Sequence, residues 1–341
     1  MKNRVATVLS LVGVALIVTA CSSGIAPIQP IAEAGGGTRL PLRNEVVSAV
    51  TLVADGAAEE GIYANPTDAS PSPDGAEIYF TALGGQNAGL YRVAATGGEV
   101  SQLAQGAPLV APVGLTVSND GQTIFVADST VESGQGMHGQ VFAVDATGGE
   151  PEPLIATAGT GARALAVAQE NGVDVLYLSG VDPSSGQPAV MRLGDDGALT
   201  VVASGAPLVE PGGLAVTTDG VLYVADRLAA GDGLGSIFRI ADGTITAVAE
   251  RVQLGNPVGL ALTTDDALLL ASALNPSTGR AQVLLIDLAS GQQGIINSVI
   301  EANSGSGGVH RAANTNVFAW ADYRGGRGGR GEEGGVYVIN P

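Results

Sequence analysis

The chain has 341 residues, of which 45% are hydrophobic and 4% aromatic, and its formal net charge is −18. This length allows a large apolar core built from Val, Leu, Ile and Ala. The acidic balance disfavours nucleic acid and anionic lipid surfaces as partners. Helical periodicity is absent outside the first twenty residues, so an all-β fold is predicted.

The N-terminus carries the pattern of an export signal. Lys2 and Arg4 precede an apolar run from Val5 to Ala20, which is short for a bilayer span and typical of a signal-peptide core. The run ends in VTAC, residues 18–21, which resembles a bacterial lipobox. That resemblance implies export, cleavage before Cys21 and fatty acylation (palmitate or a similar chain) of Cys21, which would anchor the protein to a membrane. The alternative for Cys21 is a small buried apolar residue.

These features divide the chain into three parts. Residues 1–20 are expected to form a lipoprotein signal peptide, residues 21–44 a flexible tether from lipidated Cys21, and residues 45–341 the folded domain. Cys21 is the only cysteine, so no disulfide can form within the chain. The expected location is the cell envelope, lipid-anchored and extracytoplasmic, either in the periplasm or at the cell surface.

One sixteen-residue stretch, PGGLAVTTDGVLYVAD at residues 211–226, recurs through the chain. Further copies begin at the positions Pro66, Pro112, Gly161, Pro257 and Gly307, which gives six units spaced by about 46 to 50 residues. In each clear copy two β-rich runs flank a turn such as Asp219-Gly220, and third and fourth runs follow. Six units of four strands predict a six-bladed β-propeller.

The two ends of the chain predict how the ring closes. The sixth unit ends at Pro341 after three strands, so its outer strand is missing from that end. A β-rich run from Glu45 to Val53 is available at the other end. We expect this N-terminal strand to complete the last blade and remove an exposed sheet edge.

The repeated motifs resemble those of the NHL-repeat and SMP-30/gluconolactonase-like six-bladed propellers over residues 45–341. The P-x-G-L-A-V start and the D-G-x-L-Y-V-A-D hairpin carry the resemblance, best in the second and fourth units. In the lactonase-like enzymes, residues just after the repeat proline supply acidic and Asn ligands for a divalent metal at the channel mouth. At those positions this chain has Thr67, Val113, Arg163, Gly212, Val258 and Gly308.

That ring contains no carboxylate and no Asn, and the neighbouring Asp68 stands alone one residue later. A single ligand does not make a site for a hard cation, so no metal and no other cofactor is expected. The resemblance therefore extends to the fold but not to the metal positions. Because a propeller is a platform for many functions, the site has to decide the activity.

Other polar residues fall near the same face. Asp128, Asp226 and Asp322 end the second strand in alternate units; they could form a cation or polar-ligand ring, with Asp68 as a further weak metal candidate, or cap the loop backbone. Arg163 and His310, the latter placed at the position of Leu214, could contact an anionic ligand or a partner. Alternatively, both are satisfied polar residues.

The segment YRGGRGGRGEEGG, residues 323–335, holds Arg324, Arg327 and Arg330 between two predicted strands of the last unit. Such arginines could contact a partner or an anionic glycan. The alternative is a mobile low-complexity loop, partly neutralised by the two glutamates that follow. An exported acidic protein meets no RNA, so nucleic acid is not an expected partner.

Two classes of function follow from the sequence. The first is a membrane-anchored extracytoplasmic propeller that binds an envelope protein or a small ligand at the channel-mouth face. The second is an SMP-30/gluconolactonase-like hydrolase, or a related propeller enzyme, that uses atypical site residues. The composition of the channel-mouth ring favours the first class, a binding module without catalysis.

Overall fold

The structure is a computed structural model that describes residues 49–56, 62–83, 88–134, 137–296, 306–323 and 334–340. All of these residues belong to one compact unit, Leu40–Pro341. The predicted signal peptide, the acylated Cys21 and the tether lie outside the described residues. So do Arg324 and Arg327.

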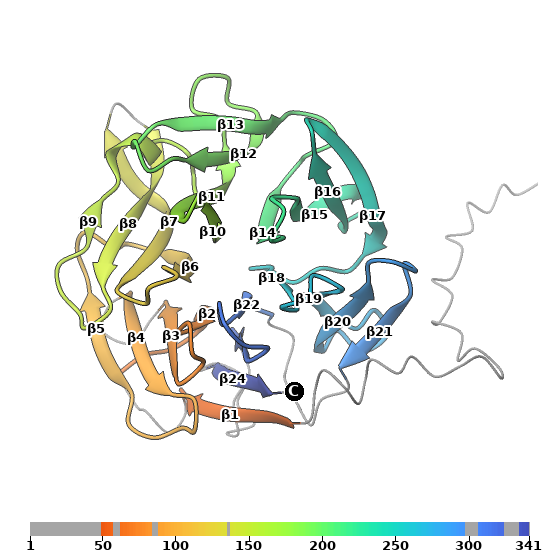
Figure 1. The fold of residues 1–341 in the computed structure, drawn as a ribbon. Coiled ribbons are helices and arrows are strands. Elements are labelled where there is room, and N and C mark those ends of the chain that lie inside the picture. Colours follow the sequence, from red (N-terminus) through yellow and green to blue (C-terminus); the bar gives the residue numbers. More distant parts are fainter. Residues whose placement is uncertain are drawn as a thin grey trace, which may run out of the picture. The chain divides into compact units, whose positions relative to one another are not determined.

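Six four-stranded antiparallel sheets surround a common centre, which confirms the predicted six-bladed propeller (Figure 1). Blades 1 to 3 consist of β2 (Pro66–Pro71), β3 (Glu77–Ala82), β4 (Gly89–Ala94) and β5 (Ser101–Gln105); β6 (Pro112–Val117), β7 (Thr123–Gly134), β8 (Met137–Asp145) and β9 (Glu152–Pro153); and β10 (Leu165–Glu170), β11 (Val173–Val181), β12 (Pro188–Leu193) and β13 (Leu199–Ser204). Blades 4 and 5 consist of β14 (Pro211–Val216), β15 (Leu222–Gly231), β16 (Leu234–Ala241) and β17 (Thr244–Val252); and β18 (Leu260–Leu262), β19 (Leu268–Leu274), β20 (Ala281–Asp287) and β21 (Gln293–Ile296). Blade 6 consists of β22 (Val309–Arg311), β23 (Phe318–Asp322), β24 (Gly335–Asn340) and β1 (Ala49–Asp55).

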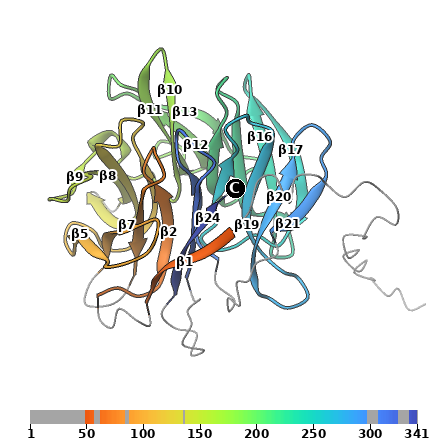
Figure 2. The same ribbon diagram turned by 60° about the horizontal axis from the view of Figure 1, so that its bottom comes forward.

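The last blade is assembled from both ends of the chain, as the sequence predicts. Strand β1 pairs antiparallel with β24, from Ala49 opposite Asn340 to Asp55 opposite Gly335. Figures 1 and 2 show the two strands side by side. The pairing gives β24 a neighbour on each side, so β24 has no open edge and β1 is the outer strand of this blade.

The core lies between neighbouring blades and is made mainly of aliphatic residues. One cluster joins blades 5 and 6 and contains Leu270, Phe318 and Trp320, each with no exposed surface. The inner strands themselves pack closely because small residues line them. A Cβ atom built on Gly259 would lie 1.9 Å from the Val309 nitrogen of the next blade, so only glycine fits there.

The hairpins that follow the inner strands share one hydrogen-bonding pattern. Ser118 donates to Asp120 Oδ1 at 2.6 Å, and the amide nitrogen of Thr123 donates back to Ser118 Oγ at 2.9 Å. Gly121 adopts the positive φ of 73° that this turn requires. Residue pairs with the same serine or threonine to aspartate bond are Ser72–Asp74, Thr217–Asp219 and Thr263–Asp265.

Bonds also run from these hairpins to the next blade. The backbone and side-chain nitrogens of Asn119 donate to Asp174 at 2.8 Å each, linking blades 2 and 3. Thr218 donates to Asp266 Oδ2 through its backbone nitrogen at 2.9 Å and its hydroxyl at 2.7 Å, linking blades 4 and 5. The hairpin end of the ring is therefore held by polar contacts as well as by the apolar core.

The sequence alignment of the sixth unit is wrong by one residue. Leu214 pairs with Val224, and the equivalent pair in blade 6 is Val309 with Trp320, not His310. The error arises because the turn of the fourth unit is one residue shorter than the turn of the sixth. Thr217 nitrogen donates to Val221 oxygen in blade 4, whereas Ala312 nitrogen donates to Val317 oxygen in blade 6. Gly307, rather than Gly308, consequently takes the blade 6 position in the predicted ring.

Candidate functional site

A cavity of about 270 Å³ lies at the end of the ring where the inner strands begin. Blades 2 to 5 contribute its walls. Four residues of the predicted channel-mouth ring line it, namely Val113, Arg163, Gly212 and Val258. We call this cavity the mouth cavity. Four of the ring positions derived from the repeat therefore lie at one pocket, and no described residue of blades 1 and 6 lines it.

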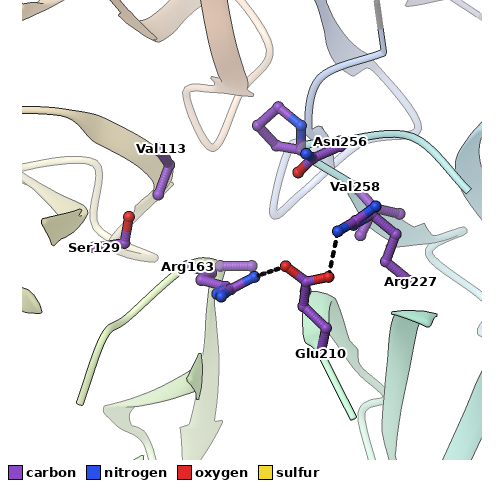
Figure 3. Close-up of a pocket in the computed structure, with 10 residues that line it drawn as sticks. Val113, Ser129, Arg163, Glu210, Arg227, Asn256 and Val258 are labelled. Atoms are coloured by element: carbon purple, nitrogen blue, oxygen red, sulfur yellow. Dashed lines mark hydrogen bonds and ion pairs between the residues drawn. The ribbon is translucent and has the colours of Figure 1, made fainter. Parts of the chain in front are cut away.

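The centre of the mouth cavity is a triad of charged side chains. Glu210 accepts a hydrogen bond from Arg163 through Oε1 and one from Arg227, at 2.5 Å, through Oε2. Figure 3 shows the two guanidinium groups reaching the carboxylate from opposite sides. The Glu210 side chain is 18% exposed, whereas those of Arg163 and Arg227 are 46% and 30% exposed. Two cations and one anion leave this cavity with a local charge of about +1 in a strongly acidic protein.

One donor of the triad is left over. The Arg227 Nε atom is buried and has no hydrogen-bond partner among the described residues. This atom has almost no accessible surface, so a ligand in the cavity would meet the terminal nitrogens of Arg163 and Arg227 instead. The mouth cavity can therefore hold a small anion against its guanidinium groups.

The two described aspartates beside the cavity hold its loops. Asp128 has no exposed surface, and its Oδ2 accepts bonds from the backbone nitrogens of Val110, at 2.7 Å, and Ala111, at 2.8 Å. Its Oδ1 accepts one from Thr130 at 3.1 Å. This carboxylate joins the loop before β6 to the part of β7 that continues beyond its pairing with β6.

Asp226 does the same in blade 4. It is fully buried and accepts bonds from the backbone nitrogens of Val209, at 2.8 Å, and Glu210, at 3.0 Å. Since Glu210 and Arg227 flank the Pro211–Asp226 pair of β14 and β15, Asp226 positions two members of the charged triad. Asp322 occupies the equivalent end of β23 and is also fully buried.

Asp68 and His310 form a second buried constellation, deeper between the inner strands. Asp68 Oδ2 lies 3.0 Å from His310 Nε2 and accepts a bond from the Leu115 nitrogen at 2.9 Å, while Oδ1 accepts one from the Ala69 nitrogen at 2.8 Å. The two side chains are 3% and 9% exposed. A Cβ atom on Gly308 would lie 1.7 Å from Asp68 Oδ1, so the carboxylate takes the space of a side chain there.

His310 therefore does not line the mouth cavity, contrary to its predicted place. His310 lies three residues after Gly307, the ring position of blade 6, and its partner Asp68 belongs to blade 1. The pair links the inner strands of blades 6, 1 and 2. Among the described residues, no group of three or more His, Cys, Asp or Glu side chains is arranged to hold a metal ion.

Sequence reasoning missed Glu210 and Arg227. A signal for them exists, because Glu210 immediately precedes the repeat proline of the fourth unit and Arg227 immediately follows its terminal aspartate. Positions flanking the repeat on both sides therefore line the mouth, not only those after the proline. In the part of the chain that the structure describes, no helix is long and apolar enough to cross a membrane.

The fold and the mouth cavity together define a six-bladed β-propeller with a charged pocket at one end of its centre. No family model matches the chain, and no curated protein sequence does either. Solved structures do match. A gluconolactonase from Xanthomonas campestris is 16% identical with a TM-score of 0.55, covering 86% of this chain and 96% of that one.

Two further solved structures are similar. A TolB-like protein from Agrobacterium tumefaciens is 14% identical with a TM-score of 0.55, covering 82% of this chain and 91% of that one. A luciferin-regenerating enzyme is 12% identical with a TM-score of 0.53, covering 85% of this chain and 96% of that one. At these identities the similarity establishes the propeller fold and leaves the activity to the site.

Proposed function

We propose that the chain is a lipid-anchored, extracytoplasmic β-propeller that binds an anionic group, of a small ligand or of an envelope protein, in its mouth cavity. The observation that carries this proposal is the triad of Arg163, Glu210 and Arg227, in which two guanidinium groups share one carboxylate at the wall of the cavity. The lipobox-like VTAC at residues 18–21 supports the anchor and the envelope location.

A carboxylate is the anion that best fits this arrangement. Guanidinium groups are planar forks that bind carboxylates through paired N–H donors. Glu210 uses one terminal nitrogen of each arginine, so other donors of both remain for a ligand. Val113 and Val258 give the same cavity apolar surface, which suits a carboxylate carried on a small hydrocarbon body.

Binding without hydrolysis is favoured over a lactonase-like reaction. A metal-assisted hydrolase needs several free oxygen ligands at one point. Asp68, the carboxylate nearest the family's metal positions in sequence, already contacts His310 and two backbone nitrogens, and Asp128 and Asp226 bind loop amides. The residues at the mouth instead supply fixed positive charge.

Titration of the full chain in detergent tests the mouth cavity. The probes are acetate, butyrate and benzoate, each compared with its uncharged amide, and calorimetry measures the affinity. We expect the carboxylates to bind and the amides not to bind, and Arg227→Gln to weaken the carboxylates by roughly tenfold or more.

Arg251→Gln is the matched control, because Arg251 is 55% exposed and does not line the cavity. Equal affinity for acids and amides would contradict the proposal. So would an Arg227→Gln variant that binds carboxylates as the unmodified chain does.

The anchor needs a separate test. Cys21→Ser removes the thiol that would be acylated, so this variant should leave the membrane fraction while the propeller still folds. If it stays in the membrane fraction after a high-salt wash, the lipoprotein assignment is wrong.

A further inference from the structure

A second cavity, of about 430 Å³, lies at the opposite end of the ring, where the inner strands finish and the hairpins begin. All six blades contribute residues to its walls, and none of these residues lines the mouth cavity. We call it the hairpin cavity. Nothing in the proposed function uses it.

Two largely buried residues with hydroxyl groups line the hairpin cavity. Ser70, at the end of β2, is 3% exposed and Thr116, at the end of β6, is 6% exposed, and both line the cavity. Neither side chain makes a hydrogen bond to another described residue. Both hydroxyl oxygens keep some accessible surface, so they can bond to water or to a ligand in the cavity.

Arg311 supplies a fixed cation in the same cavity. Its Nε donates to the Leu262 oxygen at 2.6 Å, and its Nη1 donates to the oxygens of Ala312, at 2.6 Å, Ala313, at 3.0 Å, and Thr315, at 3.1 Å. These bonds fix the guanidinium plane, and its Nη2 has no partner in the described chain. Burial lowers the pKa of Arg311, and the charge of Asp266 opposes this shift.

Asp266 supplies the opposite charge. Its Oδ2 accepts both bonds from Thr218, so its Oδ1 has no hydrogen-bond partner in the described chain. It lines the cavity together with Arg311, yet the two groups are not within ion-pair distance of each other. A ligand that carries both charges can contact both of them.

The surroundings exclude simpler ions. The hairpins at this end carry the carboxylates of Asp74, Asp120, Asp219 and Asp265, which repel a plain anion. Inside the cavity Arg311 and Asp266 carry opposite charges. A molecule with a balanced pair of charges can therefore satisfy both groups, which a plain anion or a plain cation cannot.

We propose that the hairpin cavity binds a small zwitterion of the α-amino-acid type. Its carboxylate would accept bonds from Arg311 Nη2, and its ammonium group would donate to Asp266 Oδ1. The hydroxyls of Ser70 and Thr116 would satisfy a polar side chain of the ligand. This site is separate from the mouth cavity and does not depend on the function proposed for it.

The experiment screens the twenty free L-amino acids, one at a time, by their effect on the melting temperature of the full chain in detergent. Calorimetry then measures the affinity of each amino acid that stabilises the fold, and of its N-acetyl and α-amide derivatives. We expect at least one amino acid to bind, and each derivative to bind at least roughly tenfold more weakly, because each removes one charge.

Variants locate the site. Asp266→Asn and Thr116→Val should each weaken the amino acid by roughly tenfold, whereas Asp265→Asn, in the same turn but outside the cavity, should not. Should Asp266→Asn fail to fold, the combination of Ser70→Ala and Thr116→Val tests the same cavity without touching the Thr218 contact. The proposal is wrong if no amino acid binds, if the derivatives bind equally well, or if the cavity variants retain full affinity.

Discussion

Replacing Asp68 by alanine tests the contacts that hold the inner strands together. The carboxylate is almost completely buried and accepts bonds from the Leu115 nitrogen, the Ala69 nitrogen and His310. Losing the acceptor of one buried N–H costs about 1–3 kcal/mol. Asp68→Ala leaves two buried backbone N–H groups without this acceptor and removes the partner of the His310 ring. We therefore expect Asp68→Ala to lower the free energy of unfolding by about 3–5 kcal/mol.

Urea denaturation followed by the fluorescence of Trp320 measures this change. Trp320 is the only tryptophan and is fully buried in blade 6, so it reports on the ring itself. With a slope near 3 kcal/mol per molar urea, the midpoint should fall by about 1 M or more. Asp195→Ala is the control, because Asp195 is exposed and its side chain makes no hydrogen bond to another described residue.

His310→Ala and the double variant complete a mutant cycle. If Asp68 and His310 form one unit, the double variant should lose less stability than the sum of the single variants, by about 0.5–3 kcal/mol. An Asp68→Ala midpoint equal to that of Asp195→Ala would refute the reasoning. Strict additivity would refute the coupling between the two side chains.

Three further predictions concern closure, pH and metals. Deleting residues 45–53 should lower the melting temperature sharply, because it exposes the edge of β24. Deleting residues 22–42 should change the melting temperature little. Equal melting temperatures of the two deletion variants would contradict the role of β1 in closing the ring. Hydrogen bonds from a neighbouring Ser or Thr hydroxyl lower the pKa of four hairpin aspartates, Asp74, Asp120, Asp219 and Asp265. These carboxylates therefore stabilise the fold above about pH 4, and this stabilisation is lost as the pH falls through the lowered pKa values. Urea unfolding at neutral and acid pH should show this loss, and it should shrink in an Asp120→Asn variant; an unchanged acid loss would assign it to other groups. Calcium or zinc should produce no shift in melting temperature, and lactone hydrolysis should not exceed background. A stabilisation of several degrees at sub-millimolar metal would contradict the absence of a metal site. The first residues to mutate would then be Asp68, Asp128, Asp226 and Asp322.

The repeat made the fold predictable because each copy encodes its own strands and turn. The Asp-Gly turns, the alternating runs and the missing last strand are local signals, and together they predicted six blades and the pairing of β1 with β24. The one alignment error, at His310, came from a turn that differs in length by one residue. Turn length changes register without changing the composition of the flanking strands, so an ungapped comparison could not detect it.

The site was predictable only in part, because its contacts join distant segments. The position after the repeat proline placed Arg163 at the mouth. The carboxylate that binds it belongs to the next blade, and Arg227 reaches that carboxylate from a different strand. Asp68 looked isolated in the sequence, and its partner His310 follows 242 residues later. Such pairs become visible only once the ring has brought the first and last blades together.

The strand that closes the ring has a mechanical consequence. Every residue before Ala49 connects to the propeller through β1, and the pairing of β1 with β24 starts at Ala49 opposite Asn340. Tension applied through the N-terminal segment would therefore load the Ala49–Asn340 end of the pairing first and peel the strand one residue pair at a time. Pulling on the chain by its N-terminus should open the last blade before any other, so the force that the last blade withstands limits the load the whole protein can bear.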